Sequence, residues 1–142
     1  MDRIYWKRAG FGATLVLAPF AYNLAMAYWA SVYLGFVNLP TNPSMATIVS
    51  QMGAANFVGI AVLAVAFAYL VSFAYPRSLV VMTFVVGVVI VSFNEAVHLL
   101  VISRELPNPI TLTEWVTVLV VFPLAAKLVK AALAKREVQQ NA

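Results

Sequence analysis

The chain has 142 residues, of which 63% are hydrophobic and only 10% are charged. An ordinary soluble domain carries about 25% charged residues, so this composition predicts an integral membrane protein. The net charge of +4 comes from basic residues that flank the apolar segments, which favours membrane topology over nucleic acid as its explanation. The lack of cysteine excludes disulfides, thiolate metal sites and thiol redox chemistry.

The first apolar segment predicts a transmembrane helix over about residues 11–33, because one span needs about 20 mainly apolar residues. Aromatic residues stand at both of its ends, as is typical of the membrane interface. The segment imitates a signal peptide, but its apolar run is too long for one, so we expect an uncleaved span. Pro19 is expected to kink this helix.

The second helical segment, residues 44–74, is too long for one upright span. At about 1.5 Å of rise per residue it would extend about 46 Å, well beyond the hydrocarbon core. We therefore expect a short interfacial helix over 44–52 on the outer side, a joint at Gly53, and a second span over about 54–73.

The third and fourth spans are expected over about residues 79–102 and 112–130. The third is rich in β-branched residues, but a lipid-embedded backbone must satisfy its own hydrogen bonds, which favours helix. Thr111 and Glu114 fit a capping box that opens the fourth helix, and Pro123 is a candidate kink. The polar tail, 135–142, is expected to fray.

Basic residues indicate the orientation. By the positive-inside rule both termini are expected in the cytoplasm, with the first and third loops outside. The expected fold is a single all-α domain over residues 1–142, an antiparallel four-helix transmembrane bundle in a bacterial inner membrane. Small residues in the second span would let helices approach closely, so a homodimer or other homo-oligomer is expected. All basic residues except Arg104 fall on the cytoplasmic side of this arrangement: Arg3, Lys7, Arg8, Arg77, Lys127, Lys130, Lys135 and Arg136.

Glu95 and His98 lie in the outer half of the third span. A central Asp, Lys or Arg costs about 2.5 to 3.5 kcal/mol on insertion scales, so ionisable residues at membrane depth predict a functional site. Amides and phenol hydroxyls can satisfy a buried Glu and His. A pocket that could hold or exchange a proton is therefore expected from the third span and from polar residues of the first two: Glu95, His98, Asn94, Asn23, Tyr22, Tyr28 and Asn56.

Simpler interpretations apply to some polar residues. Neutral amides often join transmembrane helices, so Asn23 and Asn56 are more simply interhelical contacts. Glu114 is interpreted as a helix cap, and Arg104 with Glu105 as a solvated loop pair. None of these last three is expected to belong to the site.

The Glu95-x-x-His98 spacing occurs in di-iron bundles, but such a site needs two motifs and two further Glu residues. A monomeric di-iron centre is therefore excluded. Across a homodimer, Glu95 and His98 could hold a divalent metal, and His98 could ligate haem. Nothing else in the sequence supports either alternative, so no cofactor is predicted.

The leading hypothesis for function is a small membrane binding or transport module. Its outward-facing pocket at Glu95 and His98 would take a small amphipathic ligand or a proton. One alternative is a small membrane enzyme, isomerase-like, that uses the pair as acid and base. Another is a non-catalytic accessory or immunity-type subunit of a larger membrane complex.

Overall fold

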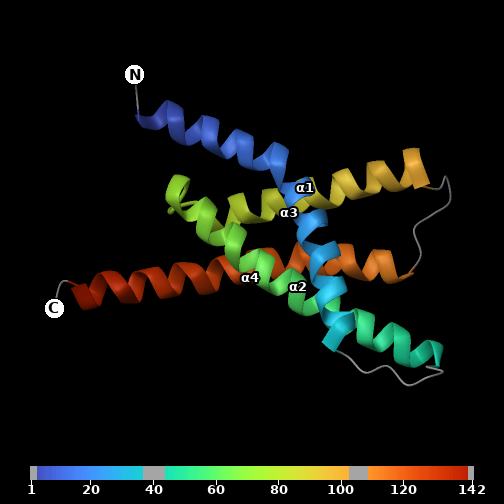
Figure 1. Cartoon of the computed structure of the whole chain (residues 1–142). Helices are drawn as coiled ribbons and strands as arrows, with labels where there is room; N and C mark the ends of the chain where they lie inside the picture. The colour runs from blue at the N-terminus through green and yellow to red at the C-terminus, as the bar shows by residue number, and fades with distance from the viewer. Residues whose placement is uncertain (1–2, 37–43, 103–108, 141–142) are drawn as a thin grey trace.

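The computed structural model describes residues 3–36, 44–102 and 109–140. This part of the chain is a bundle of four long helices, α1 to α4, with one short π-helix, η1, after α3 (Figure 1). Every regular element among the described residues is a helix, which confirms the predicted all-helical class. Each of α1 to α4 is also long and apolar enough to cross a membrane. Their bounds are α1 Arg3–Phe36, α2 Met45–Ala74, α3 Leu79–Val97, η1 His98–Ile102 and α4 Pro109–Gln140.

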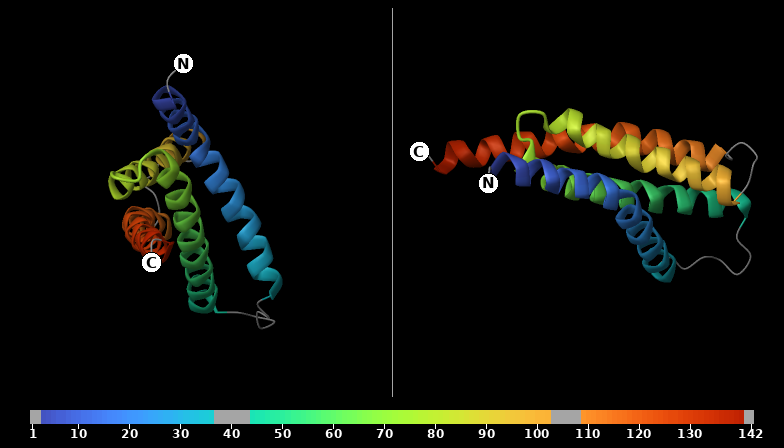
Figure 2. Two further views of the ribbon diagram at one scale, coloured as in Figure 1. Left: turned by 90° about the vertical axis from the view of Figure 1, so that its left-hand side faces the viewer. Right: turned by 90° about the horizontal axis from the view of Figure 1, so that it is seen from above.

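Helix α1 bends midway along its length, as Figure 1 and the right-hand view of Figure 2 show. Pro19 lies inside this helix. Its ring lacks the backbone N–H that would donate to the carbonyl one turn earlier, and it clashes with that carbonyl, which bends a helix. Pro19 therefore accounts for the bend in α1 that the sequence predicted.

Helix α2 is continuous, so the predicted separate helix over 44–52 and the joint at Gly53 are wrong. Glycine costs a helix about 1 kcal/mol relative to alanine, and where it ends a helix it commonly adopts the left-handed conformation. No described glycine has a positive φ. The Ser44 hydroxyl caps α2 by accepting a hydrogen bond from the Thr47 amide at 3.2 Å, and α1 supports the helix on both sides of Gly53.

That support comes from two side chains of α1. The Trp29 indole N–H donates to the Ala55 carbonyl at 2.8 Å, and the Tyr33 hydroxyl donates to Gln51 Oε1 at 2.9 Å. Because these contacts lie two residues before and two residues after Gly53 in α2, they hold both flanking turns against α1. Tertiary contacts thus favour a continuous helix over a joint.

The last part of the predicted third span is helical but widened. Helix α3 ends at Val97, and η1 covers His98–Ile102 with π-type hydrogen bonding. Single π-turns of this kind are frequently found at functional sites in helices. The widened turn begins at His98, one of the two ionisable residues that the sequence analysis placed in this span.

Helix α4 differs from its prediction at both ends. It begins at Pro109, so Thr111 lies inside the helix and cannot be its N-cap, and the predicted capping box is wrong. Proline is favoured at the first helical position because its missing N–H has no partner there in any case. At the other end the helix continues to Gln140, so the tail expected to fray is helical up to that residue.

The core lies where α2 and α3 meet the other two helices. Helix α1 packs against α2 and α3, and α4 packs against the same two helices. Phe67 of α2 and Phe122 of α4 stack with ring centroids 5.9 Å apart, and Val86 and Ile90 of α3 are fully buried beside them. The start of α1, the end of α4 and the turn between α2 and α3 lie at one end of the molecule (Figure 2).

Candidate polar site between α1, α3 and α4

Three helices enclose a partly open cavity of about 240 Å³ in the half of the bundle that contains His98. Its wall combines amide, imidazole, hydroxyl and carboxyl groups with aromatic and aliphatic side chains. The lining residues are Asn23 of α1, Phe93, Asn94 and Val97 of α3, His98 of η1, and Thr111, Glu114 and Trp115 of α4.

Two amides join α1 to α3 at this cavity. Asn23 Nδ2 donates to Asn94 Oδ1 at 2.8 Å and to the Pro19 carbonyl oxygen at 2.9 Å. The second bond reaches the residue one turn earlier, which holds the Asn23 side chain close to the bend in α1. The bond between the two amides is a contact between helices, in agreement with the simpler interpretation of Asn23.

The His98 imidazole presents a buried polar atom without a partner. Its Nε2 is shielded from solvent and makes no hydrogen bond in the part of the chain that the structure describes. The backbone N–H of His98 is shared between the carbonyls of Asn94 and Glu95, so the backbone donor of this residue is satisfied although its side-chain Nε2 is not. A buried polar atom left without a partner costs about 1 to 3 kcal/mol, so Nε2 is a favourable place for a ligand to bind.

Glu114 is the acidic residue of this cavity. Its Oε1 accepts a hydrogen bond from the hydroxyl of Tyr22 at 2.9 Å, and Tyr22 is fully buried. The sequence interpretation as a helix cap is wrong, because α4 already begins at Pro109 and the Glu114 carboxylate accepts a hydrogen bond from Tyr22 of α1. The cost of an ionisable group among apolar residues, which singled out Glu95, applies equally to Glu114 and was the signal that could have found it.

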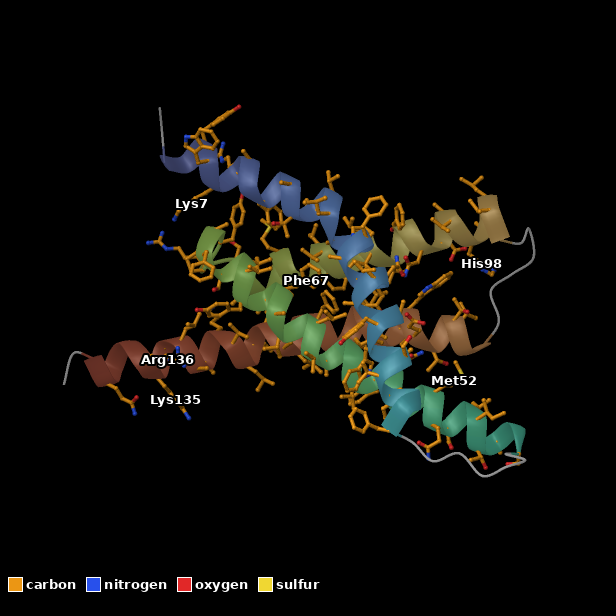
Figure 3. All side chains as sticks on the ribbon, viewed as in Figure 1. Lys7, Met52, Phe67, His98, Lys135 and Arg136 are labelled. Carbon is orange, nitrogen blue, oxygen red and sulfur yellow. The ribbon has the colours of Figure 1, made fainter. Side chains whose placement is uncertain are left out.

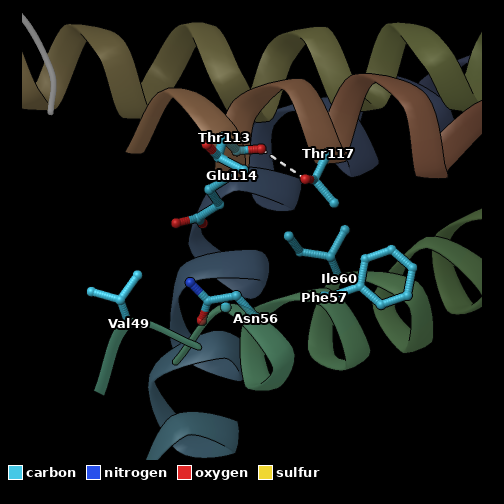
Figure 4. Close-up of a pocket in the computed structure, with 8 residues that line it drawn as sticks. Val49, Asn56, Phe57, Ile60, Thr113, Glu114 and Thr117 are labelled. Carbon is cyan, nitrogen blue, oxygen red and sulfur yellow. Dashed lines mark hydrogen bonds between the residues drawn. The ribbon is translucent and has the colours of Figure 1, made fainter. Parts of the chain in front are cut away.

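Glu114 also borders a second, smaller cavity of about 130 Å³ between α2 and α4 (Figure 4). Asn56 of α2 lines this cavity together with Thr113 and Thr117 of α4. The Thr117 hydroxyl donates to the Thr113 carbonyl at 2.7 Å. Glu114 thus lines both the polar cavity at His98 and a second, mainly apolar cavity.

The remaining predicted site residues lie elsewhere. Glu95 is half-buried on α3 and lines neither of these two cavities. Tyr28 is 73% exposed on the outside of α1. Asn23, Asn94 and His98 therefore come together with Glu114, Tyr22 reaches them through Glu114, and Asn56 belongs to the second cavity. The predicted loop pair, Arg104 and Glu105, lies outside the described residues.

Among the described residues, no group of three or more His, Cys, Asp or Glu side chains is arranged to hold a metal ion. His98 and Glu114 line one cavity, but they supply only two candidate ligands. The metal and haem alternatives that use a homodimer axis stay hypotheses.

Comparisons with protein-family models, with curated proteins and with solved structures found no match to this chain.

Proposed function

We propose that this chain crosses a bilayer four times as an antiparallel bundle and binds a small amphipathic ligand or a proton at His98 and Glu114. The surface of the bundle supports the membrane part of this proposal. Large apolar side chains are exposed on the outward faces of the helices, including Leu24 at 75% and Leu128 at 69%. Soluble monomers rarely expose apolar patches of more than a few hundred Å², whereas lipid requires them.

The distribution of charge supports the orientation. Lys7, Lys135 and Arg136 lie at one end of the bundle and His98 lies at the other (Figure 3). By the positive-inside rule the basic end faces the cytoplasm. The cavity at His98 then opens toward the outer side of a bacterial inner membrane.

The binding part of the proposal rests on one observation: the unpartnered, buried Nε2 of His98 in the wall of a cavity that also contains Glu114. An imidazole nitrogen either donates or accepts a hydrogen bond, and a carboxylate accepts one. Together the two side chains can therefore hydrogen-bond a polar group of a ligand or hold a proton. Phe93, Val97 and Trp115 offer apolar surface for the rest of a ligand. This chemistry moves the centre of the site from Glu95 to Glu114.

A second candidate function is acid–base catalysis, because two titratable side chains line the same cavity. In a double-bond isomerisation, one group would remove a proton from the substrate and the other would deliver a proton to a second carbon, with no external oxidant or reductant. The Tyr22 hydroxyl bonded to Glu114 would hold that carboxylate in place.

The experiment that tests the site uses two matched variants, Glu114→Gln and Glu95→Gln, together with His98→Ala. Native mass spectrometry of protein in native lipid particles reports a retained small molecule, and a pH-sensitive dye inside proteoliposomes reports proton flux. We expect His98→Ala and Glu114→Gln to lower ligand retention or proton flux about tenfold or more, and Glu95→Gln to leave both near wild type. If only Glu95→Gln is defective, or all three variants behave as wild type, this site is wrong.

A further inference from the structure

Two cavities at the basic end of the bundle each combine one lysine with apolar walls. The first, of about 260 Å³, lies between the start of α1 and the end of α2 and is lined by Lys7, Trp6, Phe11, Leu70 and Phe73 among others. The second, of about 200 Å³, is lined by Lys130, Leu133 and Ala134 of α4, by Pro76 of the α2–α3 connection and by Leu79 at the start of α3. Neither belongs to the polar site at His98.

The first cavity has the side-chain chemistry of a lipid-binding site at a membrane interface. Lys7 supplies an ammonium group, while the Thr14 hydroxyl in the same wall already donates to the Gly10 carbonyl at 2.9 Å. Trp6 is a residue type that concentrates at the headgroup level of bilayers. Leu70 and Phe73, both exposed on α2, continue the wall as hydrocarbon surface.

The second cavity repeats this combination on the other side of the bundle. Lys130 is exposed, and a lysine stem lies along apolar surface while its ammonium stays near water. Leu79 is buried and Leu133 packs against the core, so the wall beside the ammonium is apolar. Each of the two cavities at this end therefore places one lysine ammonium group beside apolar side chains.

The charge around both cavities favours a ligand with net negative charge. Lys7, Lys135 and Arg136 gather at this end (Figure 3), while Glu114 lines the cavity at the opposite end. A zwitterionic headgroup would bring its own cation into this positive field. An anionic phospholipid brings a phosphate without a compensating cation, and basic pockets between transmembrane helices on the cytoplasmic side typically bind such headgroups.

We infer that the two cavities bind anionic phospholipids of the cytoplasmic leaflet, with the phosphate at Lys7 or Lys130 and the acyl chains along the apolar walls. The inference depends on the proposed membrane crossing, but it does not depend on ligand binding at His98.

The test compares lysines that line the cavities with basic neighbours that do not. Full-length protein is placed in vesicles of phosphatidylglycerol and phosphatidylcholine with the same acyl chains in equal amounts, and the ratio of retained lipids is measured by native mass spectrometry. The variants are K7Q and K130Q, and the matched controls are R8Q and K127Q, each of which removes one positive charge at the same end. K7R keeps the charge in the first cavity, and the melting temperature of each variant in the same lipid checks its folding.

Wild type and K7R are expected to enrich phosphatidylglycerol, whereas K7Q and K130Q lower the retained ratio about fivefold each and the two controls change it far less. Equal losses in all four glutamine variants would assign the effect to general surface charge and overturn the inference, as would a lack of enrichment in wild type. Displacement of the lipid by excess inorganic phosphate would also overturn it. His98→Ala should keep the enrichment, so failure here and failure of the proposed ligand site are distinguishable.

Discussion

At Gly59 two side chains of α1 occupy the place that a Cβ atom would take. An added Cβ would lie 2.7 Å from Trp29 Cδ1 and 2.9 Å from Met26 Sδ. The Trp29 ring is held by its hydrogen bond to the Ala55 carbonyl, so it cannot move away without losing that bond. Gly59 is therefore required for the close approach of α1 and α2.

Gly59→Ala is expected to lower the free energy of unfolding by about 1 to 3 kcal/mol, because an extra methyl group must displace the packed indole. Gly53→Ala is the matched control in the same helix, since a Cβ there meets nothing within 4 Å. That change should be neutral or stabilising by up to about 1 kcal/mol. Unfolding in mixed detergent, followed by helical circular dichroism, measures both, and equal effects would contradict the packing argument.

Glu95 and Glu114 show that the role of an acidic residue depends on the side chains around it. Glu95 and Glu114 are both acidic residues among apolar neighbours, and a local reading of the sequence gave the first a function and the second a cap. The structure places Glu114 in hydrogen-bond contact with Tyr22 and in the walls of two cavities. The partner of a side chain, and not its own chemistry, separates these two residues.

At the scale of elements, α1 and α4 pack against the same two helices, and one long side chain connects them directly. The Tyr22 hydroxyl reaches from α1 to the Glu114 carboxylate of α4. Hydrogen bonds between transmembrane helices contribute about 0.6 kcal/mol on average and up to about 1.7 kcal/mol. A bond to a carboxyl group from a fully buried phenol belongs at the upper part of that range.

A double-mutant cycle of Tyr22→Phe and Glu114→Gln is expected to give a coupling energy of about 1 kcal/mol in unfolding experiments. Tyr28→Phe serves as the control on the same helix, because that side chain is exposed and should not couple to Glu114. A coupling energy near zero for Tyr22 and Glu114 would show that the two side chains do not act together.

At the scale of the whole molecule, the proposed orientation places Ser78 and Ser44 on opposite sides of the membrane. Both side chains are exposed, Ser78 directly before α3 and Ser44 directly before α2. The basic end of the bundle carries the α2–α3 turn, so Ser78 is expected in the cytoplasm and Ser44 outside.

The chain contains no cysteine, so single-cysteine variants report one position each. In intact cells stripped of their outer membrane, a membrane-impermeant maleimide should label Ser44→Cys at once and Ser78→Cys only after permeabilisation. The reversed pattern would invert the bundle and place the His98 cavity on the cytoplasmic side. Labelling of both positions in intact cells would contradict a membrane-spanning arrangement with these two residues on opposite sides.

The amino-acid sequence by itself determined four apolar helices, because the length and hydropathy of a segment are local properties that need no knowledge of its neighbours. It also located His98, Asn94 and Asn23 as related polar positions. It did not predict the continuity of α2, since the contacts that support the helix around Gly53 come from Trp29 and Tyr33 of another helix.

Only the tertiary structure decided which polar side chains share a cavity. Successive residues of a helix turn by about 100°, so Asn94 and Glu95 point in different directions, and a helix that is apolar on nearly every side gives little sequence signal for its rotation. Packing of α1 and α4 against α2 and α3 set those rotations. It brought Glu114 to Tyr22 and His98 to the cavity wall, and it left Glu95 outside that wall.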